Sequence, residues 1–462
     1  MQLSVSKNVH IVEPGDFEPT DHWYPRVLNS NIHPLVSYFL NLSTEQIIER
    51  YNRLHPQSDS ELLKDILSYK PSYLKWAGTD LMYVVNKLGQ RRIALIETNS
   101  CPSGQKSMPL LDLNVEQGGY KRLIEGTFKP MVDSWPESGA LAVVYDKNGM
   151  ENIGYAATIA EVFNEHVYLV NCSDFNESVK FEDGVMYVWV NASGWVKIRA
   201  AFRYVTQKPW ELIPEKCGTL LLNPLEACLA GGRNKEMAEK AYLKFNEVND
   251  PLGLQILTPA TFLNVEYSQL QEYYQMLDKA MVIKVPTSNA GQGVMTVTND
   301  NEFLDALNRL KSFQDNNLIV QQLVKAAPAH AAKNEKTWHH VGTVPDLKGR
   351  SYAFDIRMMV HYTERGMKPL AIYSRRARAP LNMGTTNNSW DVYGTNLSIR
   401  HEDGWSYEDE RLMLYDVRDF GYIGLGLYEL ISGFVQSCMA VYAIDRQAVE
   451  MFSEKSRVYN GK

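Results

Sequence analysis

The sequence predicts a mixed α/β (α+β) fold built from several domains. Strand-like and helix-like stretches alternate: an apolar run over 140–145 precedes a helical pattern over 153–164 and another strand over 167–170. Strand, helix and strand in that order imply a parallel pair of strands. Hydrophobic residues make up 45% and charged residues 22% of the chain, which is typical of a globular protein. At roughly 150 residues per domain, 462 residues indicate about three domains.

The charge balance and the cysteines argue against several protein classes. A net charge of −7 gives no general attraction to nucleic acid or anionic lipid. The five cysteines are odd in number and form no CxxC pair, so we expect neither a disulfide framework nor a structural zinc site. The first residues have no apolar core of a signal peptide, and no apolar stretch reaches the roughly 18 residues of a membrane span. We therefore expect a cytoplasmic protein without a nucleic-acid or membrane partner.

Local patterns along the rest of the chain predict its elements. Helical periodicity predicts helices over 45–54, 61–68, 235–245, 268–277, 301–312 and 422–442. Apolar runs predict strands over 80–85, 93–97, 185–190, 196–205, 281–285, 294–298, 318–323, 352–362 and 369–374. Ser43 or Thr44 is the expected cap of the first helix, and Ser60 that of the second. Turn residues join the first two strands into a hairpin, and a polar loop is expected over 375–396.

A glycine loop preceded by a lysine is the sharpest local motif. Lys284 lies on the strand over 281–285, and the loop Ser288-Asn-Ala-Gly-Gln-Gly293 follows before the next strand. Backbone N–H groups of such a loop can fold over a polyphosphate, and the ammonium adds a point charge. The order differs from a Walker loop, and no helix follows as in the dinucleotide fingerprint. An ordinary hairpin with a glycine turn is the alternative.

Two downstream strands give this loop a context. The apolar strand over 318–323 ends in polar groups at Gln321 and Gln322, and adenine needs a flat apolar slot beside an exposed backbone edge. Asp355 and Arg357 are two residues apart, so both side chains lie on one face of their strand. A purely structural ion pair between these two is the alternative interpretation.

The early hairpin places three oxygen donors together. Asp80 lies on its first strand, within Gly78-Thr-Asp80, and Glu97 and Asn99 lie on the second, within Glu-Thr-Asn-Ser-Cys-Pro-Ser-Gly. Glu97 and Asn99 are two apart and share a face. Carboxylate and amide oxygens suit Mg²⁺, a hard cation. The pattern therefore predicts a magnesium site, with a solvated polar face as the alternative.

These motifs resemble the ATP-grasp superfamily, with the metal strands first and the nucleotide loop later. That rotated order is similar to the circularly permuted members, among them the eukaryotic glutathione synthetases. The segment from Glu97 through Lys106 to Pro109 looks closer still to the bacterial peptide ligases typified by the pheganomycin-forming ligase. The resemblance implies a circularly permuted ATP-grasp fold with a small pre-ATP-grasp domain. It also implies a ligase that joins a carboxylate to an amine through an acyl phosphate, using ATP and Mg²⁺.

The resemblance also implies roles for individual residues. It places these residues around ATP: Lys235, Lys284, Ser288, Asn289, Gly291, Gln292, Gly293, Gln321, Gln322, Leu323, Val324 and Asp355. Arg357, Asn396 and Arg376 become candidate catalytic residues, although the pattern does not decide between Arg375, Arg376 and Arg378. Asp80, Glu97 and Asn99 become the metal ligands. One departure is that this loop lacks the metal-binding glutamate of the glutathione synthetase lid.

The substrate side is expected near the end of the metal hairpin and in the small domain. Ser103, Gln105 and Lys106 follow the metal strand closely, and Arg203 stands at a strand end where its guanidinium suits a carboxylate. A solvated edge strand is the alternative for Arg203. The adjacent His339 and His340 point to opposite faces of a strand and are expected to be packing or surface histidines.

Four segments follow from the resemblance. They are N-terminal helices plus the metal hairpin over 1–125, the small substrate domain over 126–225, the nucleotide region over 226–400 with a lid at about 255–330, and a helical segment over 401–462. The expected substrates are small: a carboxylate and an amine, of amino-acid or peptide type. A homodimer is left open. A phosphotransferase acting on a hydroxyl and a non-enzymatic ATP-binding regulator are the alternative functions.

Overall fold

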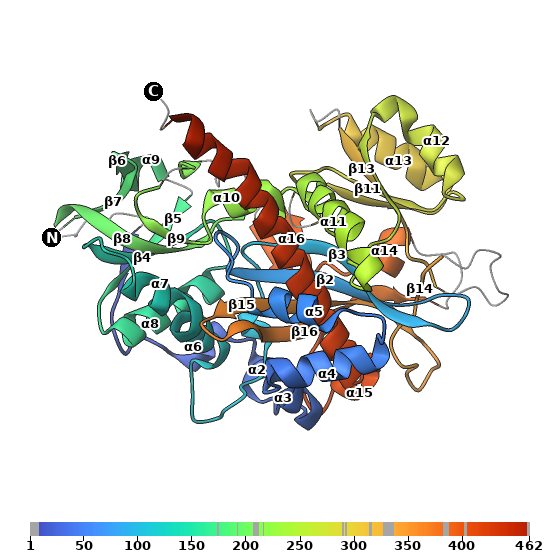
Figure 1. The fold of residues 1–462 in the computed structure, drawn as a ribbon, viewed down its shortest axis with the longest axis horizontal. Coiled ribbons are helices and arrows are strands. Elements are labelled where there is room, and N and C mark those ends of the chain that lie inside the picture. Colours follow the sequence, from blue (N-terminus) through green and yellow to red (C-terminus); the bar gives the residue numbers. More distant parts are fainter. Residues whose placement is uncertain are drawn as a thin grey trace.

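The computed structural model has the predicted mixed α/β architecture, with three larger sheets and helices around them (Figure 1). It describes residues 9–172, 175–191, 193–206, 212–215, 217–288, 291, 293–313, 317–326, 337–381, 388–401 and 404–459. Several helices and strands lie outside the elements treated below: α1 (Pro19–His22), α2 (Pro25–Leu28), α6 (Gly118–Leu123), α7 (Lys129–Asp133), α9 (Phe175–Ser178), α10 (Leu225–Ala227), α15 (Phe420–Ile423), β17 (Ser398–His401) and β18 (Gly404–Tyr407).

A six-stranded antiparallel sheet forms the centre of the molecule. Its order is β14-β2-β15-β16-β19, with β3 also paired to β2. The strands are β2 (Trp76–Val85), β3 (Arg91–Asn99), β14 (His339–His340), β15 (Tyr352–Thr363), β16 (Gly366–Pro380) and β19 (Leu412–Met413). The predicted hairpin is therefore β2 and β3, and strands from late in the chain complete its sheet.

Helix α16 (Leu427–Tyr459) covers one face of this sheet and crosses the molecule in Figure 1 as the long dark red helix. Thr79 Oγ1 and Ser437 Oγ are 2.5 Å apart. An added Cβ on Gly433 would lie 3.2 Å from Leu81, so the helix backbone approaches the sheet closely here. Because side chains alternate along a strand, Asp80 points to the opposite face.

One helix of the described chain is long and apolar enough to span a membrane by length and composition alone, over Leu427–Phe452 of α16. Of its most apolar 18-residue window, 72% is buried inside the protein. This burial is what a core helix shows. Helices α3 (Pro34–Leu40), α4 (Thr44–Leu54) and α5 (Ser60–Ser68) pack against α16, as in the edge contact of Phe39 with Phe434 at 6.3 Å between ring centroids.

The helix caps agree with the sequence at one of two positions. Ser43 caps α4 as predicted, in a capping box with Gln46. The second cap was predicted one residue too late, because Asp59 accepts from the backbone N–H groups of Glu61 and Leu62 and Ser60 is already helical. A carboxylate at this position also interacts favourably with the positive end of the helix dipole.

A seven-stranded sheet lies beside the central one. Its order is β1-β5-β4-β8-β7-β6, with β9 paired to β8. The strands are β1 (Val9–Val12), β4 (Ala140–Tyr145), β5 (Val167–Asn171), β6 (Val179–Glu182), β7 (Val185–Val190), β8 (Gly194–Tyr204) and β9 (Leu220–Leu222). The predicted parallel pair is present, since β4 runs parallel to β5 and also to β8. Helix α8 (Gly149–Phe163) packs on this sheet, with Tyr155 stacked on Phe202 at 4.3 Å.

The third sheet has four antiparallel strands in the order β10-β13-β11-β12. They are β10 (Thr261–Val265), β11 (Met281–Lys284), β12 (Val294–Val297) and β13 (Leu318–Gln322). Helices α12 (Leu270–Met276) and α13 (Asp300–Leu310) cover one face, where Tyr274 and Phe303 stack at 4.4 Å between centroids. Met281 and Ile283 point to this helical face, so Val282 and Lys284 point to the other one.

The segment over 375–396 is not the predicted polar loop. β16 continues to Pro380, and α14 (Ser389–Tyr393) follows within the described part of that segment. The three arginines of this stretch therefore lie on a strand, where neighbours alternate between faces. Another difference is that β1 joins the seven-stranded sheet by pairing with β5, although it belongs to the N-terminal segment of the expected division.

Asp445 ties α16 to the chain that enters β2. Its carboxylate is fully buried and accepts from the backbone N–H groups of Ser72, Tyr73 and Leu74 and from the hydroxyl of Tyr69, at 2.7–2.8 Å. Asp445→Asn should therefore lower the free energy of unfolding by about 2–4 kcal/mol, because an amide cannot accept all four hydrogen bonds. Urea denaturation measures this change.

The matched control is Glu450→Gln on the same helix, whose side chain is 49% exposed and pairs with Lys244 at the surface. Its effect should stay within about 0.5 kcal/mol. Equal stability of Asp445→Asn and wild type would contradict the anchoring role of this carboxylate.

Candidate active site

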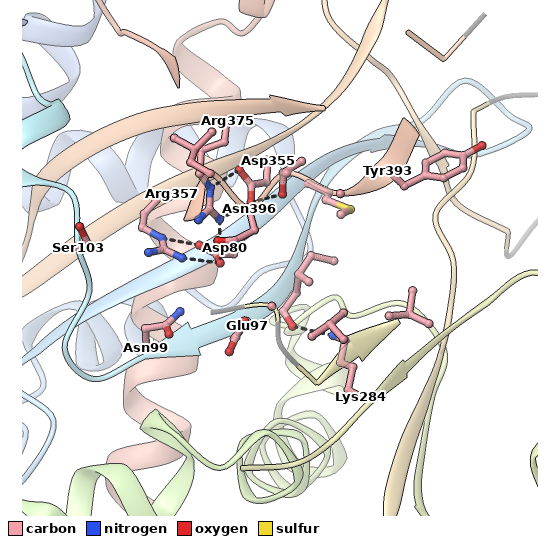
Figure 2. A pocket seen from close by; sticks show the side chains of 18 of the residues that line it. Asp80, Glu97, Asn99, Ser103, Lys284, Asp355, Arg357, Arg375, Tyr393 and Asn396 are labelled. Carbon is pink, nitrogen blue, oxygen red and sulfur yellow. Dashed lines mark hydrogen bonds and ion pairs between the residues drawn. The ribbon is translucent and has the colours of Figure 1, made fainter. Parts of the chain in front are cut away.

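A cavity lies between the six-stranded and four-stranded sheets, and loops at the end of the seven-stranded sheet line it as well (Figure 2). Among the described residues, six cationic side chains line it: Lys106, Lys147, Arg233, Lys284, Arg357 and Arg375. The acidic ones in the same part of the chain are Asp80, Glu97 and Asp355. A cavity with this excess of cations, in a chain of net charge −7, suits an anionic ligand.

Strand register brings four of the polar side chains into one row. Asp80 of β2 lies directly opposite Glu97 of β3 and Arg357 of β15, and Arg357 lies opposite Tyr373 of β16. Directly opposed residues of antiparallel strands point to the same face. The row therefore crosses four strands on the face that the cavity occupies.

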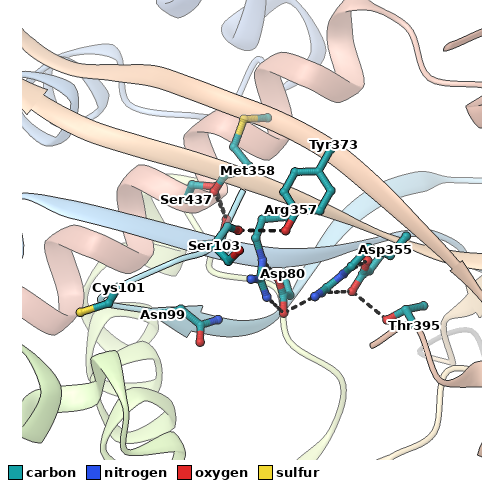
Figure 3. A network of polar contacts seen from close by, with 12 residues as sticks. Asp80, Asn99, Cys101, Ser103, Asp355, Arg357, Met358, Tyr373, Thr395 and Ser437 are labelled. Carbon is teal, nitrogen blue, oxygen red and sulfur yellow. Dashed lines mark hydrogen bonds and ion pairs between the residues drawn. The ribbon is translucent and has the colours of Figure 1, made fainter. Parts of the chain in front are cut away.

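Buried ion pairs run across these strands (Figure 3). Arg357 donates to both oxygens of Asp80, from Nε and Nη2, at 2.6 Å each. Arg375 reaches the same carboxylate at 3.0 Å and also pairs with Asp355, which accepts a further bond from Thr395. We call Asp80, Arg357, Arg375 and Asp355 the Asp80 network. The ion pair considered from the sequence, Asp355 with Arg357, is replaced by pairs between strands.

The network shifts the protonation of its members. Burial alone would raise the pKa of Asp80, but the guanidinium groups of Arg357 and Arg375 outweigh it and lower that pKa to about 2. Burial would lower the pKa of Arg357, and Asp80 raises it instead. Both partners are therefore charged at neutral pH, and Arg357 keeps its positive charge at the cavity surface.

Lys284 faces this row from the four-stranded sheet. Its ammonium lies 3.5 Å from the carbonyl oxygen of Ile96, and burial lowers its pKa to about 8, against the opposing effect of Glu97. Lys235 contacts Glu97 at 3.5 Å and donates to the carbonyl of Ser288. Lys235 thus connects the N-terminus of α11 (Lys235–Asn249) to the glycine loop, but it does not line the cavity among the described residues.

One end of the cavity, which we call the β13 end, is largely apolar. Leu323 and Val324 lie there with Met82 and Val282, and the polar Gln321 and Gln322 border it. The Gln321 amide donates to Thr261 Oγ1 at 2.9 Å, so its side chain is held within the four-stranded sheet. The residues predicted to border adenine therefore lie together at an apolar end of the cavity.

The opposite end, which we call the β4 end, carries the loop that follows β3. The Glu151 carboxylate accepts from the backbone N–H groups of Gly104 and Gln105 at 2.9 Å and from Ser103 Oγ at 2.8 Å. An added Cβ on Gly104 would lie 2.5 Å from the Tyr373 ring, so only glycine fits this position. The loop is therefore held rigidly against β16.

Cations gather at the β4 end. Lys106 lies 5.2 Å from the ring centroid of Tyr24 and 5.0 Å from that of Tyr407, and it donates to Asn148. Burial lowers the pKa of Lys106. Burial and then the nearby Arg233 lower the pKa of Lys147 to about 8. An anion bound here would offset the cost of burying these charges.

Most predicted site residues that the structure describes line this cavity: Asp80, Glu97, Asn99, Ser103, Lys106, Lys284, Gly291, Gln321, Gln322, Leu323, Val324, Asp355, Arg357 and Asn396. Ser288 and Gly293 lie in the loop nearby but outside the lining, and Gln105 is buried next to Gly119. Asn289 and Gln292 lie outside the described residues.

The structure does not bring Arg376 and Arg203 to the cavity. Arg376 lies over the ring of Tyr352 at 4.8 Å, on the other face of β16 from Arg375. Arg203 is fully buried, with Nη1 at 3.1 Å from Cys228 Sγ and 3.6 Å from Cys101 Sγ. Arg375 occupies the position predicted for Arg376, because strand alternation separates the two side chains.

Sequence reasoning missed several residues of the cavity: Lys147, Asn148, Arg233, Tyr373 and His340. Lys147 and Asn148 come directly after β4, at the carboxyl end of a parallel strand, where ligands of α/β folds commonly bind. That rule could have identified them. Arg233 donates to Asn99 Oδ1 at 3.2 Å, a contact that nothing in the sequence indicated.

Magnesium is implied by the family resemblance, and the donor set fits it in part. Mg²⁺ is usually held by one or two carboxylates together with substrate phosphates. Glu97 fits, since its side chain is 29% exposed and its ion pair to Lys235 is long. The amide oxygen of Asn99 already accepts from Arg233 at 3.2 Å, so Asn99 fits a metal-ligand role less well than Glu97. Asp80 does not fit, because both its oxygens accept from arginines. No group of three His, Cys, Asp or Glu within the described ranges could hold a metal.

Comparisons with known proteins return similar folds but no related sequence. No family model and no curated protein matches the chain. A glutathione synthetase-like effector from Globodera pallida is 8% identical, with 76% of this chain and 87% of that chain covered and a TM-score of 0.41. D-alanyl-alanine synthetase A from Vibrio cholerae is 13% identical, with 50% and 87% covered and a TM-score of 0.33. An ATP-grasp RimK domain protein from Sphaerobacter thermophilus is 14% identical, with 64% and 99% covered and a TM-score of 0.31.

Every TM-score given lies below 0.5, so the roles of individual residues rest on their contacts in this chain alone.

Asp80→Asn should destabilise the protein by about 3–5 kcal/mol at pH 7, because it leaves Arg357 buried without its anion. The folded pKa of Asp80 is about 2, below the ordinary 3.8, so its stabilisation is present above about pH 4 and is lost as the pH falls towards 2. The difference between wild type and Asp80→Asn should therefore shrink over that range. Denaturant unfolding at several pH values measures it.

Glu137→Gln, which removes an exposed partner of Lys197, is the control and should cost less than about 1 kcal/mol. A difference between wild type and Asp80→Asn that is the same at pH 7 and pH 3 would contradict the charged state of this pair.

Proposed function

We propose that the protein is an ATP-grasp ligase that joins a carboxylate to an amine through an acyl phosphate. One observation carries this proposal: a single cavity holds an apolar slot at its β13 end, Lys284 and Arg357 in its middle, and further cations at its β4 end. A nucleotide and a second anionic substrate can thus meet over Arg357. The cytoplasmic location and the homodimer stay predictions.

The nucleotide would lie with its base at the β13 end and its phosphates towards Lys284. Lys284 and the backbone N–H groups of the glycine loop are the phosphate donors of this arrangement. Glu97 and Asn99 would hold Mg²⁺ that arrives with the nucleotide, and the ion would neutralise part of the phosphate charge. The Nδ2 of Asn99 has no partner among the described residues, so this amide can donate to a phosphate oxygen.

The proposed reaction has two steps. A carboxylate oxygen of the substrate attacks the terminal phosphorus of ATP, the bond to the ADP oxygen breaks, and an acyl phosphate forms. The nitrogen of a neutral amine then attacks the acyl carbon, the bond from that carbon to the phosphate oxygen breaks, and phosphate leaves together with one proton from the amine as the amide forms. In this arrangement Arg357 would stabilise the charge that develops on the transferred group, and Asp80 orients its guanidinium. Positioning and charge neutralisation supply the rate enhancement.

The chemistry of Cys101 supports a path without a covalent enzyme intermediate. Cys101 lines the cavity, but burial raises the pKa of its thiol well above the ordinary value. The reactive thiolate is therefore scarce at neutral pH. Its sulfur also contacts the backbone oxygen of Arg203 at 3.3 Å, so it points away from the middle of the cavity.

The β4 end suits an amino acid or a peptide. Lys106, Lys147 and Arg233 offer cations to a carboxylate, and the rings of Tyr24 and Tyr407 offer flat apolar surfaces. An amino acid or a short peptide has a carboxylate that the cations can bind and a part that can pack against the rings. The supporting side chain Glu151 fixes this end independently of any ligand.

The direct test is incubation with ATP, Mg²⁺ and a panel of amino acids and short peptides, with and without hydroxylamine. The expected result is ADP release with an amide, and a hydroxamate when hydroxylamine traps the acyl phosphate. Glu97→Gln should lower this turnover at least about 100-fold with unchanged unfolding, since among the described residues its carboxylate makes one long ion pair, to Lys235. Glu116→Gln, an exposed glutamate, is the matched control.

Other outcomes identify the alternatives. A stable phosphorylated hydroxyl product without amide would replace the ligase with a phosphotransferase. ATP binding without turnover of any amino acid or peptide in the panel would favour a non-enzymatic ATP-binding regulator. Full activity of Glu97→Gln would remove Glu97 from the proposed metal site.

ATP affinity should fall as the pH rises from 7 to 9. The Lys284 pKa is about 8 in the free protein, and a triphosphate binds the protonated form, so Kd should rise about tenfold over this range. Lys284→Arg keeps its charge and should lose this dependence. Isothermal titration at pH 7, 8 and 9 measures it.

Lys147→Arg is the control, because the pKa of Lys147 is also about 8 but it lies at the β4 end. Its ATP affinity should keep the wild-type pH dependence. If the Kd for ATP did not depend on pH in Lys147→Arg but still rose with pH in Lys284→Arg, Lys147 would be the phosphate-binding lysine instead of Lys284.

A further inference from the structure

His340 lines the cavity with a polar ring that has no partner. It is 3% exposed, and neither Nδ1 nor Nε2 forms a hydrogen bond with any described residue. It lies on β14 directly opposite Val84 of β2, hence on the same face as Met82 and Asp80. A buried ring nitrogen without a partner is costly, so it calls for a ligand or an ordered water.

The protonation of this ring fits a neutral hydrogen-bonding role. Burial lowers the pKa of His340 to about 4, so the imidazole is uncharged at neutral pH. A neutral imidazole offers one N–H donor and one nitrogen acceptor. It can therefore contact the edge of a heterocyclic base, and it brings no charge to attract a phosphate.

His340 lies at the β13 end of the cavity, next to the segment that follows β13. Its backbone N–H donates to the carbonyl of Lys325 at 2.8 Å, directly after Val324. Val324 packs with Met82 and Val84 in a small apolar cluster. The ring thus borders the apolar slot, and it supplies a polar side chain at the point where a flat base would end.

The neighbouring His339 has different surroundings. Its ring interacts with backbone groups of Ala326 and Lys325, so only its Nδ1 lacks a partner among the described residues, and it is absent from the described lining of the cavity. Alternation along β14 separates the two rings. His339 therefore has a structural role in this strand, whereas the ring of His340 is left for a ligand.

We propose that His340 hydrogen-bonds the edge of the purine base and makes nucleotide binding base-selective. This inference rests on the proposed function, since it needs ATP in this cavity. It adds a specificity residue that neither the glycine loop nor the metal hairpin supplies.

The test compares ATP with inorganic tripolyphosphate, which lacks the base, in wild type, His340→Leu and His339→Leu. Leucine fills most of the ring volume without a polar atom. His340→Leu should weaken ATP binding about 3- to 10-fold, the effect of one hydrogen bond, and should leave tripolyphosphate binding unchanged. Its melting temperature should not fall, because an unpartnered polar group is replaced by an apolar one. His339→Leu should leave the ratio of the two affinities unchanged.

Base analogues identify the contact. 1-Deaza-ATP and 7-deaza-ATP each lack one ring acceptor, and one of them should bind more weakly than ATP to wild type but equally to His340→Leu. Unchanged ATP affinity in His340→Leu, or an equal loss for ATP and tripolyphosphate, overturns the inference. Wild-type protein that binds neither probe overturns the proposed function itself, so the two failures are distinguishable.

Discussion

The Asp80 network is the constraint on which the cavity depends. Its charges are buried, and buried charges are tolerated only when they are paired and hydrogen-bonded. The Arg357 fork on Asp80 and the bridge through Arg375 to Asp355 satisfy that condition by joining β2, β15 and β16 on one face. The guanidinium of Arg357 is thereby oriented before any ligand arrives, which is the preorganisation that electrostatic catalysis requires.

Because side chains alternate along a strand, the central sheet has one face that packs against α16 and one face that lines the cavity. Thr79 and Leu81 point towards α16, whereas Asp80 between them points into the cavity. The apolar side is packed against a long helix, and Asp445 anchors that helix to the start of β2. A rigid rear face therefore supports the polar one. The four-stranded sheet supplies the opposite wall, so Lys284 approaches the row from a separately packed element.

Short sequence patterns predict many of the elements of this structure. Contacts between strands that are far apart in the sequence could not be predicted in this way. The hairpin of β2 and β3, the shared face of Asp355 and Arg357, and the parallel strands around α8 follow from short patterns. The partner of Asp80 could not be predicted, because it depends on the register of strands 277 positions apart. The sequence predicts a loop at Arg376, and only the length of β16 shows that its neighbour Arg375 faces the cavity. Arg203 is predicted at the end of a strand, where its guanidinium could reach a substrate. Strand β8 lies inside its sheet, however, and the Arg203 side chain is buried there.

The order of strands in the six-stranded sheet has a consequence for how the chain acquires its structure. β2 and β3 leave the ribosome early, yet the arginines that neutralise Asp80 are made only after the other two sheets. Until then the hairpin exposes an unpaired edge and an uncompensated carboxylate. Such distant pairings slow folding, since the loop between them must close first. The strands of the seven-stranded sheet follow one another along the chain, except β1. This sheet can therefore form before the last strands of the central sheet have been synthesised.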